Sequence, residues 1–391
     1  MQLRPHQEQA VKAMLRNTKG QIIVPTGGGK TMCMIDDAMN EFSRSYMGQT
    51  IVVVAPRILL ANQLSAEFLE FIDNAEVLHV HSGETRHYST TQASRISVWS
   101  AKNCAFNQII FTTYHSLHRI QESGIHVDTI YFDEAHNSVQ KNFYQSTEYF
   151  SNHAERCYFF TATPKHSRTP SKAGMNWTKT YGQVICQVPA PKLVNQGYIL
   201  PPKVEVYKTR ILEKDELVAD RDSEQMIDAI DNLKKNKVLI CAKSTKQIVN
   251  LVAHTKFVSE LAWRGYSYML ITSKTGAIID GEKVTREEFF DVLNAWGQDP
   301  DKRFVVLHHS ILSEGMNVKG LEAVLFMRSM DYIGISQTIG RVIRKGAKDK
   351  VFGLVCIPVY SKVGISTATK VEAVVDTIFN KGEAATTVIT R

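Results

Sequence analysis

The sequence lacks the features that would assign it to a membrane or to the secretory pathway. It has no uncharged apolar stretch of about 18 residues, the length needed to cross a bilayer as a helix. The first residues, Met1-Gln2-Leu3-Arg4-Pro5, have no apolar core of the kind that a signal peptide carries. We therefore expect a soluble, cytoplasmic protein with no membrane partner.

Cysteine is scarce, and its pattern argues against two common kinds of stabilisation. The 391 residues include 6 cysteines and no C-x-x-C pair, and four of the six lie in apolar runs that resemble strands. We expect buried, reduced thiols, with neither a disulfide framework nor structural zinc. A metal at His79, His81 and His87 is not supported either, because no carboxylate or cysteine accompanies them in the sequence.

The composition is that of a globular protein with a weak preference for polyanions. Hydrophobic residues make up 43% of the chain, and its length allows two or three domains of ordinary size. The formal charge of +7 favours nucleic acid as a partner but is also common among other enzymes.

Apolar runs of strand length alternate with amphipathic segments along the chain. In the first half, the expected strands are Gln21–Val24, Thr50–Ala55, Gln108–Thr112, Thr129–Phe132 and Cys157–Thr161. In the second half, they are Lys203–Tyr207, Val238–Cys241, Tyr268–Thr272, Phe304–His308, Ala323–Met327 and Val351–Ile357. Runs of this kind suit strands that are buried on both faces. The alternation predicts an α/β fold with mostly parallel sheets flanked by helices.

A proline-rich stretch separates the two halves. Residues 187–202 contain four prolines and are the best linker candidate in the chain. We expect domain 1 over residues 1–186, this linker, domain 2 over residues 203–362, and a C-terminal helix and tail over residues 363–391.

The most informative segment is Val24-Pro25-Thr26-Gly27-Gly28-Gly29-Lys30-Thr31, which lies between an expected strand and an expected helix. Glycines allow backbone N–H groups to surround phosphate oxygens, and the helix N-terminus adds partial positive charge. Lys30 would reach the β- and γ-phosphates of a nucleoside triphosphate, and Thr31 would ligate Mg²⁺. The strict pattern has glycine at position 24, where this chain has valine.

Two acids, Asp133 and Glu134, follow the expected strand Thr129–Phe132. Ligand sites in α/β proteins form at this end of a strand. Asp133 would hold the Mg²⁺ that Thr31 also contacts, and Glu134 would orient and deprotonate the attacking water. Taken alone, the acids could be a charge pair at a helix N-terminus, but the phosphate loop upstream favours phosphoryl transfer.

Two further segments carry groups that could act on a phosphate. Thr161 and Thr163 follow another expected strand and could bond the Asp-Glu segment or sense the γ-phosphate, although a simple strand-end turn is the alternative. Gln337, Arg341 and Arg344 recur at the spacing of one helix face. These arginines could stabilise charge on the transferring phosphoryl group, and a solvated basic face is the alternative.

Together these segments resemble a known superfamily. Pro25–Thr31, Asp133–His136, Thr161–Thr163 and Gln337–Arg344 look like motifs I, II, III and VI of superfamily 2 helicases. The resemblance implies two RecA-like domains with the ATP site in the cleft between them. It also implies that His136, Thr161 and Thr163 couple the nucleotide state to the rest of the protein.

Four more segments fit the same superfamily. The Leu3–Gln7 segment resembles the Q motif, in which Arg4 and Gln7 would contact adenine. Ser313–Asn317 looks like motif V, which links ATP to nucleic acid; Gly315 and Asn317 would belong to the nucleotide site, although many relatives carry Asp at the position of Asn317.

The other two segments resemble motifs that touch the nucleic-acid backbone. The segments and their candidate residues are motif Ia, with Pro56 and Arg57, and motif Ib, with Thr112, Thr113 and Tyr114. Domain 2 would carry motifs IV, V and VI.

Within the superfamily, the motifs are most similar to the UvsW, RadD and restriction-enzyme motor group of phages and bacteria. That similarity implies an ATP- and Mg²⁺-dependent helicase or translocase that acts on DNA rather than RNA, in replication, recombination or repair, and that works as a monomer. An RNA helicase and an ATP-gated DNA-binding or annealing subunit without strand separation remain as alternatives.

Strand separation requires a wedge in addition to a motor. Residues 274–283 contain an Asp280-Gly281 turn signal together with Ile278 and Ile279, which we expect to be exposed. This stretch is a candidate wedge, and an ordinary connecting loop is the alternative.

Overall fold

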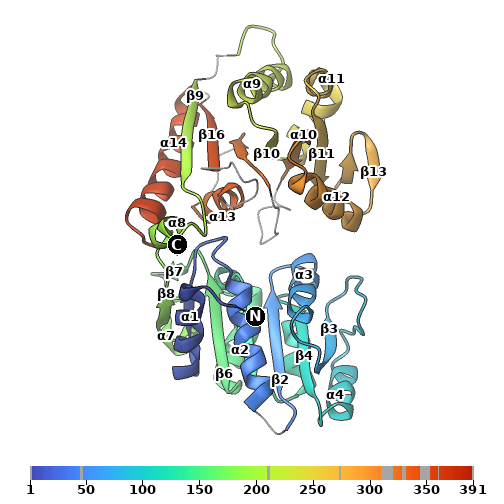
Figure 1. Cartoon of the computed structure of the whole chain (residues 1–391), viewed down its shortest axis with the longest axis vertical. Helices are drawn as coiled ribbons and strands as arrows, with labels where there is room; N and C mark the ends of the chain where they lie inside the picture. The colour runs from blue at the N-terminus through green and yellow to red at the C-terminus, as the bar shows by residue number, and fades with distance from the viewer. Residues whose placement is uncertain are drawn as a thin grey trace. The chain divides into compact units, whose positions relative to one another are not determined.

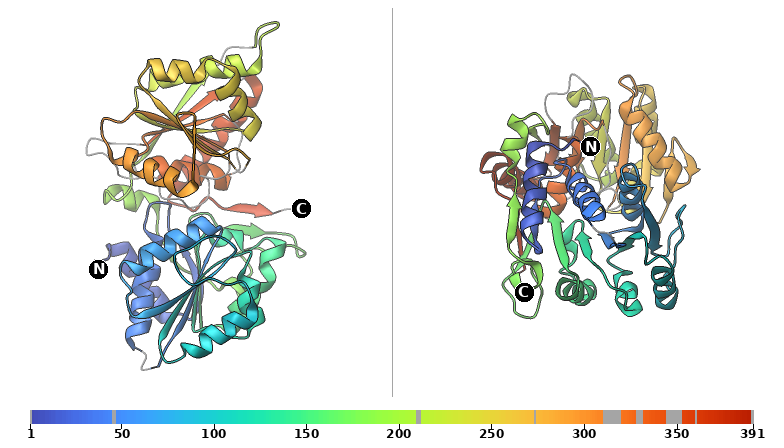
Figure 2. Two further views of the ribbon diagram at one scale, coloured as in Figure 1. Left: turned by 90° about the vertical axis from the view of Figure 1, so that its right-hand side faces the viewer. Right: turned by 60° about the horizontal axis from the view of Figure 1, so that its bottom comes forward.

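The computed structural model describes residues 2–44, 47–208, 212–272, 274–309, 320–327, 332–343, 353–359 and 361–389. The chain divides into two compact units. Unit 1 comprises Met1–Pro189 with Ala384–Arg391, and unit 2 comprises Ala190–Glu383. Each unit is a sheet with helices on both faces, as Figures 1 and 2 show.

Unit 1 is built on seven parallel strands in the order β3-β4-β2-β5-β6-β1-β8. These strands are β1 (Lys19–Ile23), β2 (Thr50–Ala55), β3 (Ala75–Val80), β4 (Asn107–Thr113), β5 (Thr129–Phe132), β6 (Arg156–Thr161) and β8 (Val184–Gln187). All six residues of β2 are buried, as expected for an apolar strand between two helical layers.

The helices of unit 1 cover both faces of this sheet (Figure 1). On one face lie α1 (Pro5–Arg16), α2 (Lys30–Arg44) and α3 (Ile58–Leu69). On the other lie α4 (Ala93–Lys102), α5 (Leu117–Ser123), α6 (Lys141–His153) and α7 (Thr178–Tyr181). Apolar side chains from β2, β4, β5 and β6 form a continuous core with this second group of helices.

Unit 2 has an eight-stranded sheet in the order β13-β12-β11-β14-β10-β15-β16-β9. These strands are β9 (Pro202–Lys208), β10 (Lys237–Cys241), β11 (Ser267–Thr272), β12 (Gly276–Ile279), β13 (Glu282–Val284), β14 (Phe304–His308), β15 (Ala323–Phe326) and β16 (Gly353–Val359). The strands pair in parallel except for β12 and β13, which form an antiparallel edge.

The helices of unit 2 also form two layers. One layer contains α9 (Val218–Leu233), α10 (Thr245–His254) and α11 (Phe257–Trp263), and the other contains α12 (Arg286–Gln298), α13 (Tyr332–Val342) and α14 (Ser361–Val375). The predicted α/β class with mostly parallel sheets is confirmed. None of the helices that the structure describes is both long and apolar enough to cross a membrane.

Two segments near the expected domain boundaries have structure of their own. The proline-rich stretch contains helix α8 (Ala190–Asn195), whose Leu193 is fully buried within unit 2. After the π-helical turn Asp376–Asn380, the chain returns to unit 1 as β17 (Thr387–Ile389). Strand β17 pairs in parallel with β7 (Lys165–Ser167), so the last residues form part of unit 1 rather than a separate tail.

A buried ion pair joins the helix after the phosphate loop to the sheet. Asp37 on α2 is fully buried and accepts two hydrogen bonds from the Arg156 guanidinium, at 3.0 and 2.7 Å. The Tyr131 hydroxyl donates a third, at 2.6 Å, and burial together with the charge of Asp37 raises the pKa of this hydroxyl. Because Arg156 begins β6 and Tyr131 lies in β5, this cluster fixes α2 on both strands.

We expect Asp37→Asn to lower the free energy of unfolding of unit 1 by about 2 kcal/mol, because the Arg156 guanidinium loses its fully buried carboxylate and keeps only Glu41 Oε1, at 2.9 Å. Hydrogen exchange of peptides from β5 and β6 measures this loss, with peptides of unit 2 as an internal reference. The control Asp73→Asn changes an exposed aspartate and should stay within about 0.5 kcal/mol of the parent. An Asp37→Asn protein as stable as this control would contradict the prediction.

Candidate nucleotide site

The phosphate loop leaves the sheet between β1 and α2. Val24, the departure from the strict glycine pattern, is fully buried, and its N–H donates to the Thr161 carbonyl at 3.1 Å. Val24 therefore continues the strand, and the loop proper begins at Pro25. The Gly28 N–H donates to the Pro25 carbonyl at 2.9 Å, which closes a turn directly before α2 begins at Lys30.

Two glycines give the loop its shape. Gly27 and Gly29 have φ values of 85° and 79°, in the left-handed region that disfavours other residues. A Cβ on Gly29 would also collide with the side-chain amide of Gln7. The loop is thus a narrow backbone cradle at the N-terminus of a helix, where unpaired N–H groups and the helix dipole favour an anion.

The start of α1 holds this loop through two side chains. Gln7 Nε2 donates to the Gly29 carbonyl at 3.1 Å, and its Oε1 accepts the Arg4 N–H at 2.8 Å. His6 is fully buried, and its Nε2 lies 2.7 Å from the Gly28 carbonyl. A carbonyl only accepts, so Nε2 carries the proton. The structure thus brings Gln7 to the loop, and it gives His6, for which the sequence predicted no role, a contact with the same loop.

The acidic pair lies directly beyond the end of β5. Both side chains are nearly buried, and the Asp133 N–H donates to the Val54 carbonyl at 2.9 Å. Glu134 has a φ of 45°, a left-handed conformation that is rare and strained for glutamate. This turn directs its carboxylate to the phosphate loop, where Glu134 Oε1 lies 3.2 Å from Lys30 Nζ.

Burial, reinforced by the negative charge of Glu134, raises the pKa of Asp133 to about 7, although Lys30 opposes the shift. Two buried carboxylates next to one another repel, and a cation between them relieves that repulsion. Asp133 is therefore chemically suited to a divalent cation, the role that the sequence predicted for it.

A chain of polar contacts continues from Glu134 to the end of β6. His136 Nδ1 lies 3.6 Å from Glu134 Oε2, 3.0 Å from Thr161 Oγ1 and 3.4 Å from Thr163 Oγ1. The Thr163 N–H donates to Thr161 Oγ1 at 3.0 Å. The three residues predicted to couple the nucleotide state to the rest of the protein are therefore in contact with the acidic segment.

The candidate nucleic-acid residues differ in exposure. Thr112 and Thr113 are buried, and Thr112 Oγ1 donates to the Val80 carbonyl at 2.9 Å. Tyr114 is also buried, and its hydroxyl donates to the Asp133 carbonyl at 2.8 Å, so its side chain positions the acidic turn. Pro56 is buried as well, whereas Arg57 precedes α3 and is exposed.

The loop residues fit a triphosphate with Mg²⁺. Thr26 Oγ1 is buried and has no hydrogen-bond partner among the described residues, as expected of a polar atom reserved for a ligand. Thr31 lies in the first turn of α2, on the next residue after Lys30. Thr31 and Asp133 would hold the ion, which would neutralise phosphate charge.

The predicted residues of unit 2 are only partly described. Gln337 lies buried on α13, and Arg341 follows one turn later in the same helix. Gly315, Asn317 and Arg344 lie outside the described residues.

The candidate wedge is the β12–β13 hairpin. Its turn has φ values of 45° at Asp280 and 92° at Gly281, which is the conformation that an Asp-Gly hairpin turn requires. Ile278 and Ile279 were expected to be exposed, but both are half-buried, and Ile278 packs against the core of unit 2. The hairpin is therefore anchored to its sheet and does not present a free apolar tip.

Comparison with known proteins supports the helicase resemblance. Residues 1–166 match the family described as "Type III restriction enzyme, res subunit". Over 360 residues, the chain is 24% identical to the DEAD-box ATP-dependent RNA helicase 46 of Arabidopsis thaliana. The match includes 88% of this chain but 49% of that relative, so the chain spans about half of the relative's length.

Solved structures with the same fold include two Type ISP restriction-modification enzymes, one bound to DNA and one in complex with a DNA substrate mimic. LlaBIII has a TM-score of 0.76 at 17% identity, over 100% of this chain and 31% of that enzyme. A nuclease-deletion mutant of LlaGI has a TM-score of 0.69 at 20% identity, over 99% of this chain and 30% of that enzyme. Dbp5 of S. cerevisiae, bound to RNA and ADP BeF3, has a TM-score of 0.61 at 14% identity, over 98% of this chain and 89% of Dbp5.

The fold is that of RecA-like helicase domains. Together with the motifs, the family match over most of unit 1 confirms the resemblance to superfamily 2 helicase motors. The particular similarity to the UvsW and RadD group stays a prediction.

We expect Gly29→Ala to weaken ATP binding by about tenfold or more, because the new methyl group meets both an unfavourable φ and the Gln7 amide. Titration with a fluorescent ATP analogue measures the effect. In a Gln7→Ala background the collision is gone but the φ strain remains, so the same substitution should weaken binding less.

The matched control is Gly124→Ala, which has a φ of 67° and no atom within 4 Å of the added Cβ. It should leave ATP affinity unchanged. Equal effects of Gly29→Ala with and without Gln7 would show that the close approach of the amide has no part in shaping the loop.

Proposed function

We propose that this chain is an ATP-driven motor on nucleic acid, a helicase or translocase that acts on DNA. The observation that carries the proposal is the unbroken line of contacts from Lys30 through Glu134 and His136 to Thr161 and Thr163. This line joins the group that would bind the γ-phosphate to the group that would activate water. It then continues to the turn after the next strand. A site that only bound phosphate would need no such connection.

The contact between Lys30 and Glu134 suggests how the cycle would begin. Lys30 Nζ lies 3.2 Å from Glu134 Oε1, so the two charges compensate one another. A bound triphosphate offers Lys30 a stronger negative partner, which would free the Glu134 carboxylate to accept a proton from the attacking water. His136 Nδ1 lies 3.6 Å from Glu134 Oε2 and also contacts Thr161 and Thr163, so a movement of the carboxylate would be transmitted to these threonines.

Unit 2 would supply the second half of the chemistry. In the motor that the resemblance implies, Gln337, Arg341 and Arg344 approach the γ-phosphate when ATP binds and stabilise its transition-state charge. Loss of the γ-phosphate then releases them. Each cycle would close and open the two units on a nucleic-acid strand, with Arg57 among the backbone contacts.

Two observations favour DNA as the nucleic acid along which the motor would move. The family that matches residues 1–166 is named for a restriction enzyme, and the two restriction-modification enzymes with TM-scores of 0.76 and 0.69 are bound to DNA and to a DNA substrate mimic, respectively. The runner-up is an RNA helicase. It is favoured by the 24% identity to an RNA helicase and by the RNA-bound Dbp5 structure.

We expect Glu134→Gln to lower ATP turnover by about 100-fold or more while ATP still binds, because an amide of the same shape cannot accept the proton. Lys30→Ala should abolish turnover and also weaken ATP binding. Steady-state hydrolysis with saturating DNA and equilibrium ATP binding measure the two effects. Glu122→Gln, an exposed glutamate of α5, is the control. Normal turnover in Glu134→Gln would remove Glu134 from the catalytic role.

We expect DNA, tested in single-stranded, duplex and branched form, to stimulate ATP hydrolysis more than RNA of equal length does. A triplex-displacement assay then tests movement, because only a translocase strips a third strand ahead of it. Stronger stimulation by RNA would favour the RNA helicase. DNA stimulation without triplex displacement would favour an ATP-gated clamp or annealing subunit, and no stimulation by either polymer would refute the motor.

A further inference from the structure

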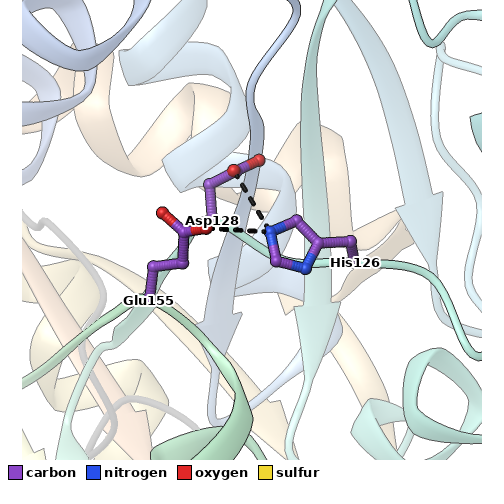
Figure 3. A group of neighbouring side chains, drawn as sticks. All are labelled: His126, Asp128 and Glu155. Atoms are coloured by element: carbon purple, nitrogen blue, oxygen red, sulfur yellow. Dashed lines mark ion pairs between the residues drawn. The ribbon is translucent and has the colours of Figure 1, made fainter.

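A second cluster of polar side chains lies at the amino-terminal ends of the unit 1 strands, opposite the ends that carry the nucleotide site. His126 and Asp128 come directly before β5, and Glu155 comes directly before β6. The nucleotide-site residues Asp133 and Thr161 lie at the other ends of these two strands. Figure 3 shows both carboxylates directed at the same imidazole nitrogen. This cluster is therefore separate from the nucleotide site.

The two distances from the imidazole nitrogen to the carboxylates match the edges of a metal tetrahedron. His126 Nε2 lies 3.4 Å from Asp128 Oδ1 and 3.3 Å from Glu155 Oε1, and the three ligand atoms all lie within 4.8 Å of one another. A tetrahedral zinc ion has ligands at about 2.0 to 2.2 Å, which places neighbouring ligand atoms about 3.3 to 3.6 Å apart. Charge-assisted hydrogen bonds are shorter, at about 2.7 to 2.9 Å. The two N···O distances in the cluster therefore suit ligands of one shared ion better than a direct hydrogen bond between the imidazole and the carboxylates.

The backbone around the cluster is held in place before any ion binds. Asp128 Oδ2 accepts the Thr50 N–H at 2.6 Å, which leaves Oδ1 directed toward His126. The Arg156 N–H donates to the Asp128 carbonyl at 2.9 Å, so the segments that carry Asp128 and Glu155 are joined directly. A second hydrogen bond on a ligating carboxylate is the usual way in which proteins orient it.

His79, which the sequence did not support as a metal ligand, has a different role. His79 is buried, with one ring nitrogen 3.0 Å from His81 and the other 3.0 Å from Ser65. Burial, together with its histidine neighbours, lowers the pKa of His79 to about 3. Both of its nitrogens are engaged in the core, whereas His126 is exposed and faces two carboxylates.

We propose that His126, Asp128 and Glu155 bind one divalent transition-metal ion, best matched by Zn²⁺, with water in the fourth position. One imidazole and two carboxylates suit zinc or cobalt, whereas Mg²⁺ and Ca²⁺ take oxygen ligands. The ion ties the loop after α5 to the start of β6 and so stabilises the sheet from the edge opposite the nucleotide. Two of the three ligands are exposed, so the site exchanges its ion with solution.

The test is calorimetric titration of the full chain with Zn²⁺, without nucleotide and with Mg²⁺ in excess to occupy oxygen-only sites. A Cys104→Ser background removes an exposed thiol that could bind zinc on its own. We expect one zinc per chain, and an affinity about 10- to 100-fold weaker in both His126→Ala and Glu155→Gln. Co²⁺ should give the visible absorption of tetrahedral cobalt in the parent and lose it in both variants.

The control is His254→Ala, which removes an exposed histidine of unit 2 and should leave binding unchanged. Zn²⁺ should also raise the melting temperature of the parent but not of the two variants, since an ion that binds only the folded state stabilises it. Absence of zinc binding to the parent, or equal binding by His126→Ala, would overturn the proposal. Neither readout depends on ATP hydrolysis, so the result is independent of the proposed motor function.

Discussion

The parallel pairing of β5, β6 and β1 is the constraint on which the candidate site depends. These strands are neighbours in the sheet and run in the same direction. Their carboxyl ends therefore meet at one edge, and the segment that follows each strand lies beside the other two. The phosphate loop after β1 (residues 25–31) lies far in the chain from the acidic turn after β5 (residues 133–134) and from the threonines after β6 (residues 161 and 163). Strand order alone makes them neighbours, before any side chain makes a contact.

The contacts within this edge compete with a ligand. Lys30 pairs with Glu134, and Gln7 and His6 hold the carbonyls of the glycine loop. The first contact uses the charge that a phosphate would take, whereas the other two engage only carbonyl oxygens of the loop. The backbone of the site is thus preorganised. Its side chains include two buried carboxylates and one lysine, so Lys30 balances the charge of only one of them.

Much of this arrangement could be predicted from the sequence, because local patterns carry it. The apolar run Thr50–Ala55 became β2 with the same ends, and the glycine loop lies between a strand and a helix as its spacing indicated. What the sequence missed depends on long-range contacts. Strand β3 lies at the edge of the sheet, where its first residues are half-exposed and show no apolar run. The role of His6 follows from the packing of α1 against α2, which no short pattern encodes.

Tyr114 shows that a sequence motif does not predict where a single side chain points. Its sequence context resembles a nucleic-acid motif, yet its ring is buried and its hydroxyl holds the Asp133 carbonyl. A motif identifies a segment, but the direction of each side chain depends on the strand's place in the sheet. In β4 the neighbours on both sides bury Thr112 and Thr113, so the segment that follows is fixed from within. The predicted contact to nucleic acid and the observed contact to the acidic turn would join the two sites through one short segment.

The two ends of the unit 1 strands, called here the carboxyl edge and the amino edge, differ in how their polar groups are paired. At the carboxyl edge, Glu134 and the glycines adopt strained or left-handed backbone, and Thr26 keeps a buried hydroxyl without a partner among the described residues. At the amino edge, Asp37 is fully paired with Arg156 and Tyr131. Rearrangement is easiest where polar groups lack partners and the backbone is strained, and hardest where buried charges would lose theirs. A change of ligand should therefore move the loops at the carboxyl edge while the amino edge keeps the strands in register.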